Sequence, residues 1–198
     1  NQLLVVREWF ANHSELDSLE RVACSTKDTK ESETAKLYWK VFSESLANGQ
    51  FRRNRNGNDW NAMFNYAYAI LLSCVLRYLL AWGIDPSFGI FHVARAQSTP
   101  LAYDLMEPFR PGFDARIIAW IIQQRQAGVD DNEIGLISKD FKKYIASTLL
   151  LPVHYRGEDM SLRQVIEKSI KTFKDTVANL QTGDYEPWRI STTKWGGF

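Results

Sequence analysis

The sequence contains few cysteines, a nearly balanced charge and no long uncharged apolar run, and each of these features excludes a class of protein. Cys24 and Cys74 are far apart, so they form neither a disulfide framework nor a Cys-x-x-Cys metal pair. We therefore expect reduced thiols in a cytoplasmic protein. The formal net charge is only +1, so any contact with nucleic acid has to come from local basic patches.

The most apolar stretch, residues 62–82, is almost long enough to cross a bilayer. Asn65 and Arg77 interrupt it, and an arginine is costly at membrane depth. We therefore predict a central helix that is buried on most sides, and no contact with a membrane. The N-terminal residues reach a charge already at Arg7, so no signal peptide is expected.

The 198 residues are 45% apolar and 24% charged, which is typical of one folded domain with a sizeable core. Apolar residues recur at helical spacing, and no run of useful length alternates with the period of a strand. The sequence therefore predicts an all-α fold, with residues 1–198 forming one compact multi-helix domain and residues 183–198 a coil tail. The predicted helices are 1–12, 29–47, 60–82 (capped by Asp59), 111–127, 138–150 and 161–181 (capped by Ser161).

One short stretch combines His92, Asp104, Glu107 and Arg110. An imidazole and carboxylates are ligands for a divalent metal, and a metal beside positive side chains suits phosphodiester chemistry. In a helical turn Asp104 and Glu107 would lie on one side, although Pro108 disfavours helical geometry at Glu107. Alternatively, His92 is a hydrogen-bonded structural residue, and the two acids favour the positive end of the following helix.

Glu31 heads an apolar stripe that continues with Ala35, Tyr38 and Phe42. A carboxylate on the core side of a helix needs a compensating metal or cation. A capping box, with Asp28 as the N-cap residue and Glu31 at the third helical position, explains the same spacing without a metal. The spacing alone leaves both interpretations open.

Basic side chains gather in a polar loop and in the last third of the chain. Charge runs on helices are usually solvated, but uneven placement in a nearly neutral chain favours contact with phosphate. The candidate DNA-binding residues are Arg52, Arg53, Arg55, Arg110, Lys139, Lys142 and Lys143.

Three linked blocks of this sequence have a characteristic order and spacing, and two weaker blocks flank them. The three are residues 61–71 (Asn-Ala-Met-Phe-Asn-Tyr-Ala-Tyr-Ala-Ile-Leu), 83–92 (Gly-Ile-Asp-Pro-Ser-Phe-Gly-Ile-Phe-His) and 101–111 (Leu-Ala-Tyr-Asp-Leu-Met-Glu-Pro-Phe-Arg-Pro); the flanking ones are 31–39 and 161–187. Together these blocks resemble the CRISPR-associated integrase family, whose members are called CRISPR-associated protein one. The resemblance covers the family's helical catalytic lobe, from about residue 25 to residue 188.

The resemblance implies a metal-dependent DNA endonuclease and integrase of a prokaryote, active in spacer acquisition for antiviral defence. Such an enzyme inserts a short prespacer DNA into a CRISPR array through attack of a 3′-hydroxyl on a phosphodiester. By position, the family's metal ligands fall on Glu31, His92 and Glu107, with Asp104 as a neighbouring essential acid. The implied cofactor is Mg²⁺ or Mn²⁺.

The implied partners are double-stranded DNA, a second copy of the chain and the ferredoxin-like CRISPR-associated protein two. Ser32 replaces the family's usual glycine, and no counterpart of the family's N-terminal β-rich domain is present. The chain is therefore either a fragment or a naturally minimal integrase. A non-catalytic DNA-binding scaffold of the same fold is the alternative function.

Overall fold

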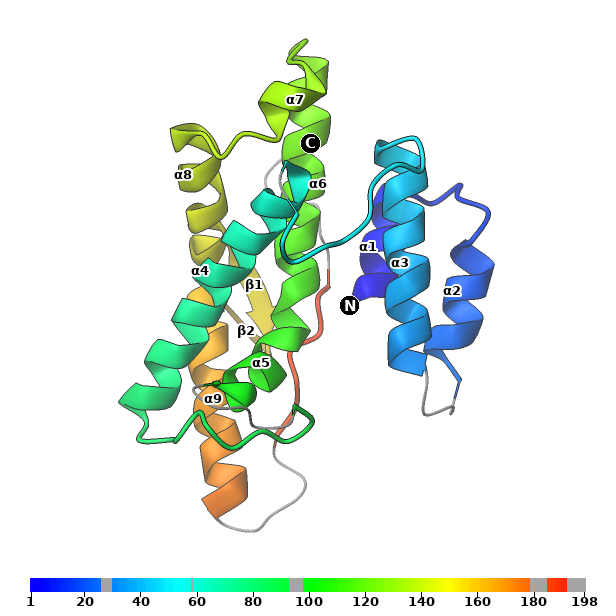
Figure 1. Ribbon diagram of the computed structural model, residues 1–198. Helices are drawn as coiled ribbons and strands as arrows, with labels where there is room; N and C mark the ends of the chain where they lie inside the picture. The colour runs from blue at the N-terminus through cyan, green and yellow to red at the C-terminus, as the bar shows by residue number, and fades with distance from the viewer. Residues whose placement is uncertain (26–29, 58, 93–97, 179–184, 192–198) are drawn as a thin grey trace.

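The computed structural model describes residues 1–25, 30–57, 59–92, 98–178 and 185–191. Three helices form an N-terminal group: α1 (Gln2–Trp9), α2 (Leu16–Ala23) and α3 (Lys30–Leu46). They stand on the right in Figure 1, joined to the rest of the fold by the segment that follows α3. Helix α3 ends as the sequence predicts, because Asn48 and Gly49 both have positive φ and the Gly49 N–H donates to the Ser43 carbonyl.

The second group is built around two long helices, α4 (Trp60–Ala81) and α6 (Arg110–Gln126), which pack on each other. Helix α6 is reached through α5 (Pro100–Met106) and a 3-10 turn, η1 (Glu107–Phe109). The remaining elements surround this pair in Figure 1. They are α7 (Asp131–Ile134), α8 (Lys139–Ser147), the 3-10 turn η2 (Thr148–Leu150), β1 (Pro152–Tyr155), β2 (Glu158–Ser161) and α9 (Leu162–Ala178).

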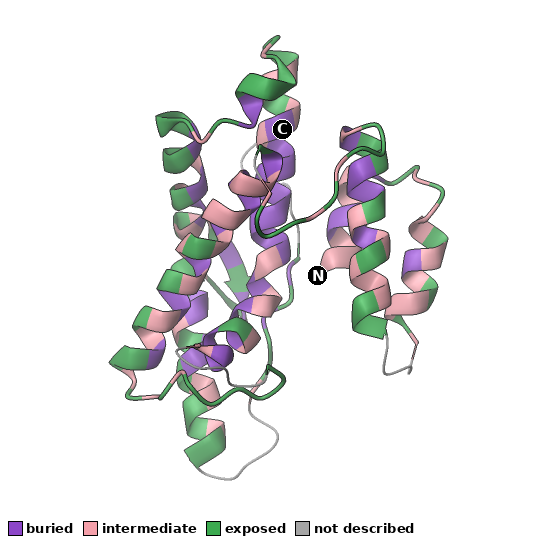
Figure 2. Ribbon diagram, in the orientation of Figure 1, coloured by how far each residue is buried: buried purple, intermediate pink, exposed green. Residues whose placement is uncertain are grey.

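One hydrophobic core joins the two groups. Helix α6 is buried along most of its length (Figure 2), with Phe113, Ile117 and Ile121 fully inside. Across the junction, the rings of Phe42 on α3 and Phe64 on α4 meet edge to face, with 5.4 Å between their centroids. The aromatic contacts hold α3 against α4, and this packing places the start of α3 opposite α5.

Helix α4 is the predicted central helix, and by length and composition it could cross a membrane. Eight of its positions are buried in the core, and it packs against α5, α6, α8 and α9. Its exposed residues are confined to one side, and its other positions are buried or half-buried, so the predicted central helix buried on most sides is confirmed; the exposed residues are Ala69, Ser73, Arg77, Leu80 and Ala81. The apolar surface of α4 is thus used within the fold.

The fold is predominantly helical, as predicted, but the all-α expectation missed an antiparallel hairpin between β1 and β2. Val153 and Tyr155 of β1 are buried while their neighbours are exposed. Arg156 and Gly157 connect the strands with positive φ at both residues, the conformation that a two-residue hairpin turn requires. The strands are only four residues each, too short for the period-two pattern to stand out.

Two of the predicted helix starts can be compared with the capping bonds. Ser161 caps α9 as predicted, because its hydroxyl accepts from the Gln164 N–H while the Gln164 side chain accepts from the Ser161 N–H. Asp59 occupies the N-cap position of α4, but its side chain makes no capping bond. The sequence also missed the short helices α2 and α7.

The segment 185–191 is coil, as predicted for the tail, yet it is packed rather than loose. Trp188 is buried, and its ring stacks on Phe109 with 5.5 Å between the centroids. The Asn1 side chain donates to the carbonyls of Pro108 and Trp188 and accepts from the Ile190 N–H. The start of the chain therefore fixes this segment beside η1.

Candidate active site

Asp104 on α5 organises the segment that carries His92. Its carboxylate accepts the backbone N–H groups of Ile90, Phe91 and His92 at 2.6, 3.1 and 3.2 Å. It also bonds His92 Nδ1 at 2.6 Å. Although burial favours the neutral acid, these four hydrogen bonds hold the pKa of Asp104 below its ordinary value. Asp104 is therefore charged, and both of its carboxylate oxygens accept hydrogen bonds from residues 90–92.

The bond from Asp104 also fixes how His92 can act. When Nδ1 donates to a carboxylate, Nε2 is the ring nitrogen that keeps its lone pair. The His92 side chain is 45% exposed while that of Asp104 is only 2% exposed. A buried carboxylate behind an exposed imidazole is the arrangement that commonly orients a histidine toward a metal. His92 can thus serve as a ligand through Nε2, with Asp104 as the residue that positions it.

Glu107 continues the helical path instead of breaking it. Pro108 was expected to disfavour helical geometry at Glu107, yet Glu107 adopts it, with φ −54° and ψ −41°. A proline disfavours this conformation at the preceding residue without forbidding it, and the chain tightens into η1, whose first turn needs no N–H from Pro108. The prediction that the next helix starts near residue 111 holds for α6, which begins at Arg110.

Glu31 reaches the same place from a distant part of the chain. It lies in the first turn of α3 and is exposed, so the expectation that it points toward the core is wrong, although Tyr38 and Phe42 of its stripe are buried. We call the cavity that it lines the carboxylate cavity. Its lining includes Glu31, His92, Asp104, Glu107, Phe91 and Tyr185. Asp28, the alternative cap for this helix, lies outside the described residues.

The carboxylate cavity contains the donor types that Mg²⁺ or Mn²⁺ prefers, namely carboxylate oxygens and an imidazole nitrogen. In this structure the three predicted ligands do not surround a common point. Within the described part of the chain, no three His, Cys, Asp or Glu side chains form a group that could hold a metal ion. One carboxylate oxygen of Glu107 is bonded instead to Arg110, with Oε1 2.6 Å from Nη1. The donor types suit the cation, but in this structure they are not gathered around one point, and one Glu107 oxygen is paired with Arg110.

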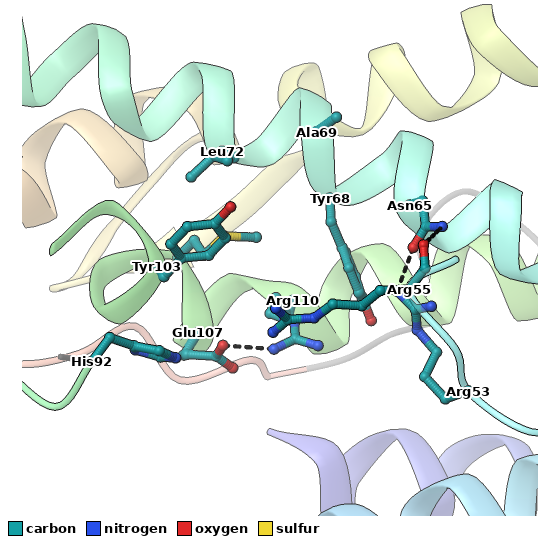
Figure 3. Close-up of a pocket in the computed structure, with 11 residues that line it drawn as sticks. Arg53, Arg55, Asn65, Tyr68, Ala69, Leu72, His92, Tyr103, Glu107 and Arg110 are labelled. Atoms are coloured by element: carbon teal, nitrogen blue, oxygen red, sulfur yellow. Dashed lines mark hydrogen bonds and ion pairs between the residues drawn. The ribbon is translucent and has the colours of Figure 1, made fainter. Parts of the chain in front are cut away.

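A second cavity shares a wall with the first, and we call it the arginine pocket. Figure 3 shows its lining, with Arg53, Arg55 and Arg110 directed toward one another. His92 and Glu107 line both cavities. His92 and Glu107 therefore lie between the carboxylate cavity and the positively charged arginine pocket.

Aromatic faces and amides hold two of these arginines in place. Arg53 donates to the side-chain oxygens of Asn61 and Asn65 at 3.1 and 2.8 Å. The ring of Tyr68 lies 5.4 Å from the Arg53 guanidinium carbon and 4.5 Å from that of Arg110. One tyrosine thus supports two cations through its ring face.

Asp114 lies behind this pair, and the sequence reasoning missed it. Its carboxylate is 1% exposed and accepts the hydroxyls of Tyr38 and Tyr68. Burial raises the pKa of Asp114 to about 6, although the two hydroxyls and the charges of Arg110 and Arg53 act in the opposite direction. A signal was present in the sequence, since an aspartate four residues after Arg110 lies on the same face of an otherwise apolar helix.

The structure divides the predicted DNA-binding residues. Arg53, Arg55 and Arg110 meet in the arginine pocket. Arg52 is exposed and lines different cavities, beside Phe51. The three lysines are exposed on α8, and none of them lines either part of the candidate site; they are Lys139, Lys142 and Lys143.

A family model described as "CRISPR associated protein Cas1" matches residues 13–148. The chain belongs to the Cas1 family. The match spans α2 to α8, so it includes every residue of the candidate site except the C-terminal wall of the carboxylate cavity. The family-level expectation from the sequence is confirmed.

Two curated relatives give the extent of the likeness. The chain is 25% identical over 173 residues to the CRISPR-associated endonuclease Cas1 of Korarchaeum cryptofilum, covering 80% of this chain and 50% of the relative. It is 38% identical over 119 residues to CRISPR-associated protein Cas1 3 of Methanobrevibacter ruminantium, covering 57% and 36%. This Cas1-family chain thus spans about half the length, or less, of these relatives.

A solved structure described as "Casposase bound to integration product" has the same fold as this chain. The TM-score is 0.67 at 21% sequence identity, and the alignment covers 93% of this chain and 65% of the other. The helical arrangement is therefore one that a protein bound to an integration product also adopts.

Replacing Asp104 by Ala is expected to reduce both metal affinity and any metal-dependent activity by about ten- to a hundredfold, the usual effect of losing a residue that orients a metal-bound histidine. Because Asp104 also holds the backbone of residues 90–92, Asp104→Asn serves as the comparison, since it retains acceptor capacity on one oxygen. Titration of Mn²⁺ measures the affinity, and circular dichroism checks the fold. Equal affinities in all three proteins would contradict the orienting role.

Proposed function

We propose that this chain is the catalytic lobe of a metal-dependent DNA integrase of CRISPR adaptation, which joins short prespacer DNA to a CRISPR array. One observation carries the proposal: His92 and Glu107 form the common wall of the carboxylate cavity and the arginine pocket. The proposed metal ligands therefore line one side of these two residues, and the arginines that could bind phosphate line the other side. Membership of the Cas1 family supports the same reading.

In this proposal Glu31, His92 and Glu107 hold the cation, and Asp104 keeps the imidazole oriented through Nδ1. A divalent cation held there would polarise the attacked phosphodiester and stabilise charge on the leaving oxygen. Arg53, Arg55 and Arg110 bind the phosphate backbone and hold the strand in register. Phe91 and Tyr185 line the same cavity beside these ligands.

The reaction requires no nucleophile from the protein. The 3′-hydroxyl oxygen of the incoming strand bonds to phosphorus, the existing bond from phosphorus to the 3′ oxygen of the target breaks, and that oxygen leaves as a new 3′-hydroxyl. One phosphodiester is formed for each one broken, so no external energy source is needed. The arginine pocket would hold the phosphodiester, while double-stranded DNA, a second copy of the chain and CRISPR-associated protein two remain the predicted partners.

Joining of a short duplex to a supercoiled plasmid carrying a repeat tests the proposal. With Mg²⁺ or Mn²⁺ we expect covalent joined product and relaxation of the plasmid, and with a chelator neither. A duplex ending in 3′-dideoxynucleotides is the matched control, because it binds equally well but lacks the attacking hydroxyl.

The alternative, a non-catalytic scaffold of the same fold, predicts a different result in the same experiment. It would bind the duplex with a steep dependence on salt and give no product with either cation. Product that forms equally well in chelator would instead contradict the metal assignment.

A further inference from the structure

Arg110 lies at the boundary of the two cavities and is bonded to one of the predicted ligands. Its Nη1 lies 2.6 Å from Glu107 Oε1, and the two side chains are 29% and 38% exposed. The dashed line in Figure 3 marks this contact, with Glu107 and Arg110 side by side in the pocket. A carboxylate oxygen that is paired with a guanidinium is a poor ligand for a cation, because the two positive charges compete for it.

Arg110 has a second support besides Glu107. Its guanidinium lies over the Tyr68 ring, and the buried carboxylate of Asp114 lies beyond that ring, bonded to the Tyr68 hydroxyl. These supports come from α4 and α6, on the side away from Glu107. Arg110 can therefore stay at the mouth of the pocket when its bond to Glu107 is broken.

The arginine pocket offers Arg110 another partner when a phosphate enters. Arg53, Arg55 and Arg110 line it, and Glu107 is the only acidic residue in its described lining. A guanidinium bonds a phosphate in the same forked geometry as a carboxylate. An entering phosphodiester would thus meet three arginines and one carboxylate, and Arg110 is the arginine that is paired with that carboxylate, Glu107.

We propose that Arg110 exchanges Glu107 for a phosphate of the bound DNA, and that this exchange releases Glu107 to complete the cation site with Glu31 and His92. This inference rests on the proposed function and adds that binding of DNA and binding of the cation are coupled. Without DNA the ion pair holds the site in a form that binds the cation weakly. Since coupling between two ligands is reciprocal, DNA raises the affinity for the cation and the cation raises the affinity for DNA by the same factor.

Binding of Mn²⁺, followed by electron paramagnetic resonance, tests the exchange in the full chain with and without a short duplex ending in 3′-dideoxynucleotides. In the wild-type protein, saturating duplex should tighten Mn²⁺ binding. Arg110→Gln removes the competitor for Glu107, so it should bind Mn²⁺ about fivefold more tightly than wild type without DNA, as expected for loss of a partly exposed ion pair. With saturating duplex the two proteins should bind Mn²⁺ with affinities within about twofold of each other, because the pair is already broken.

Arg55→Gln is the matched control. Arg55 is a cation of the same pocket but has no ion pair with Glu107, so its loss reports only the general effect of removing a positive charge. It should change Mn²⁺ affinity by the same factor with and without DNA. Equal behaviour of the two variants, or a wild-type affinity that DNA does not alter, overturns the exchange.

The result separates this inference from the proposed function. If the wild-type protein joins DNA and binds Mn²⁺ equally well with and without the duplex, the exchange is wrong and the integrase proposal stands. If it neither joins DNA nor binds Mn²⁺ in the presence of the duplex, both are wrong.

Discussion

Replacing His92 by Ala is expected to reduce strand joining by at least about a hundredfold. Loss of a residue that merely orients a metal ligand already costs up to about that much, and in the proposed site His92 supplies the ligand nitrogen itself. The side chain is about half exposed, so its removal leaves no large void in the core. The joining assay measures the loss, and the thermal midpoint of unfolding should shift by only a few degrees.

His154→Ala provides the matched control for this prediction. His154 also bonds an aspartate through Nδ1, at 2.9 Å from Asp159, and is 58% exposed, but it lies on the hairpin and lines neither cavity. It should join DNA at the wild-type rate. Wild-type activity in His92→Ala would show that the metal-site assignment is wrong.

The long helices were predictable because their apolar positions recur often enough to be recognised. In α3 and α4 the stripe continues for several turns, and a clear stop follows, such as Asn48 and Gly49. Helices α2 and α7 have eight and four residues, too few to establish a period against polar neighbours. Each strand of the hairpin also has only four residues, and its recognition depended on the turn at Arg156 and Gly157.

The candidate site was only partly predictable for a different reason. His92, Asp104 and Glu107 are near each other in the sequence, so their proximity follows from local chain geometry. The apolar stripe of its helix suggested a cation near Glu31, but residue spacing does not reveal that Glu31 lines the same cavity as these residues, which depends on the packing of α3 against α4. The roles of Tyr38, Tyr68 and Asp114 also depend on contacts between separate helices.

A series of side-chain contacts runs from the wall shared by the two cavities to the buried carboxylate of Asp114. Arg110 contacts Glu107 on one side and the Tyr68 ring on the other, and the hydroxyl of that ring bonds Asp114. Asp114 is thus the buried end of a chain of contacts that reaches the proposed ligand. A change in its protonation alters the stability of the fold, and the sign of this effect follows from the direction of its pKa shift.

The wild-type protein is expected to gain stability from Asp114 as the pH falls from about 7 to about 4. The pKa of Asp114 is about 6 in the folded protein, against 3.8 as its ordinary value. Between these values the folded state binds the proton more tightly than the unfolded state, so acidification favours folding by about 3 kcal/mol in total. The gain begins as the pH falls through about 6 and is complete near 4.

Asp114→Asn cannot take up this proton, so the difference in unfolding free energy between wild type and variant isolates the effect from all other titrating groups. Urea denaturation at several pH values measures it, and the difference should rise in favour of wild type as the pH falls. Asp131→Asn is the control of opposite sign, because the hydrogen bond from Arg125 lowers the pKa of Asp131 and its stabilisation is lost on acidification. A wild-type minus Asp114→Asn difference that does not vary with pH would mean that the Asp114 carboxylate remains charged over this range, and that Arg110 and the two tyrosines compensate its burial completely.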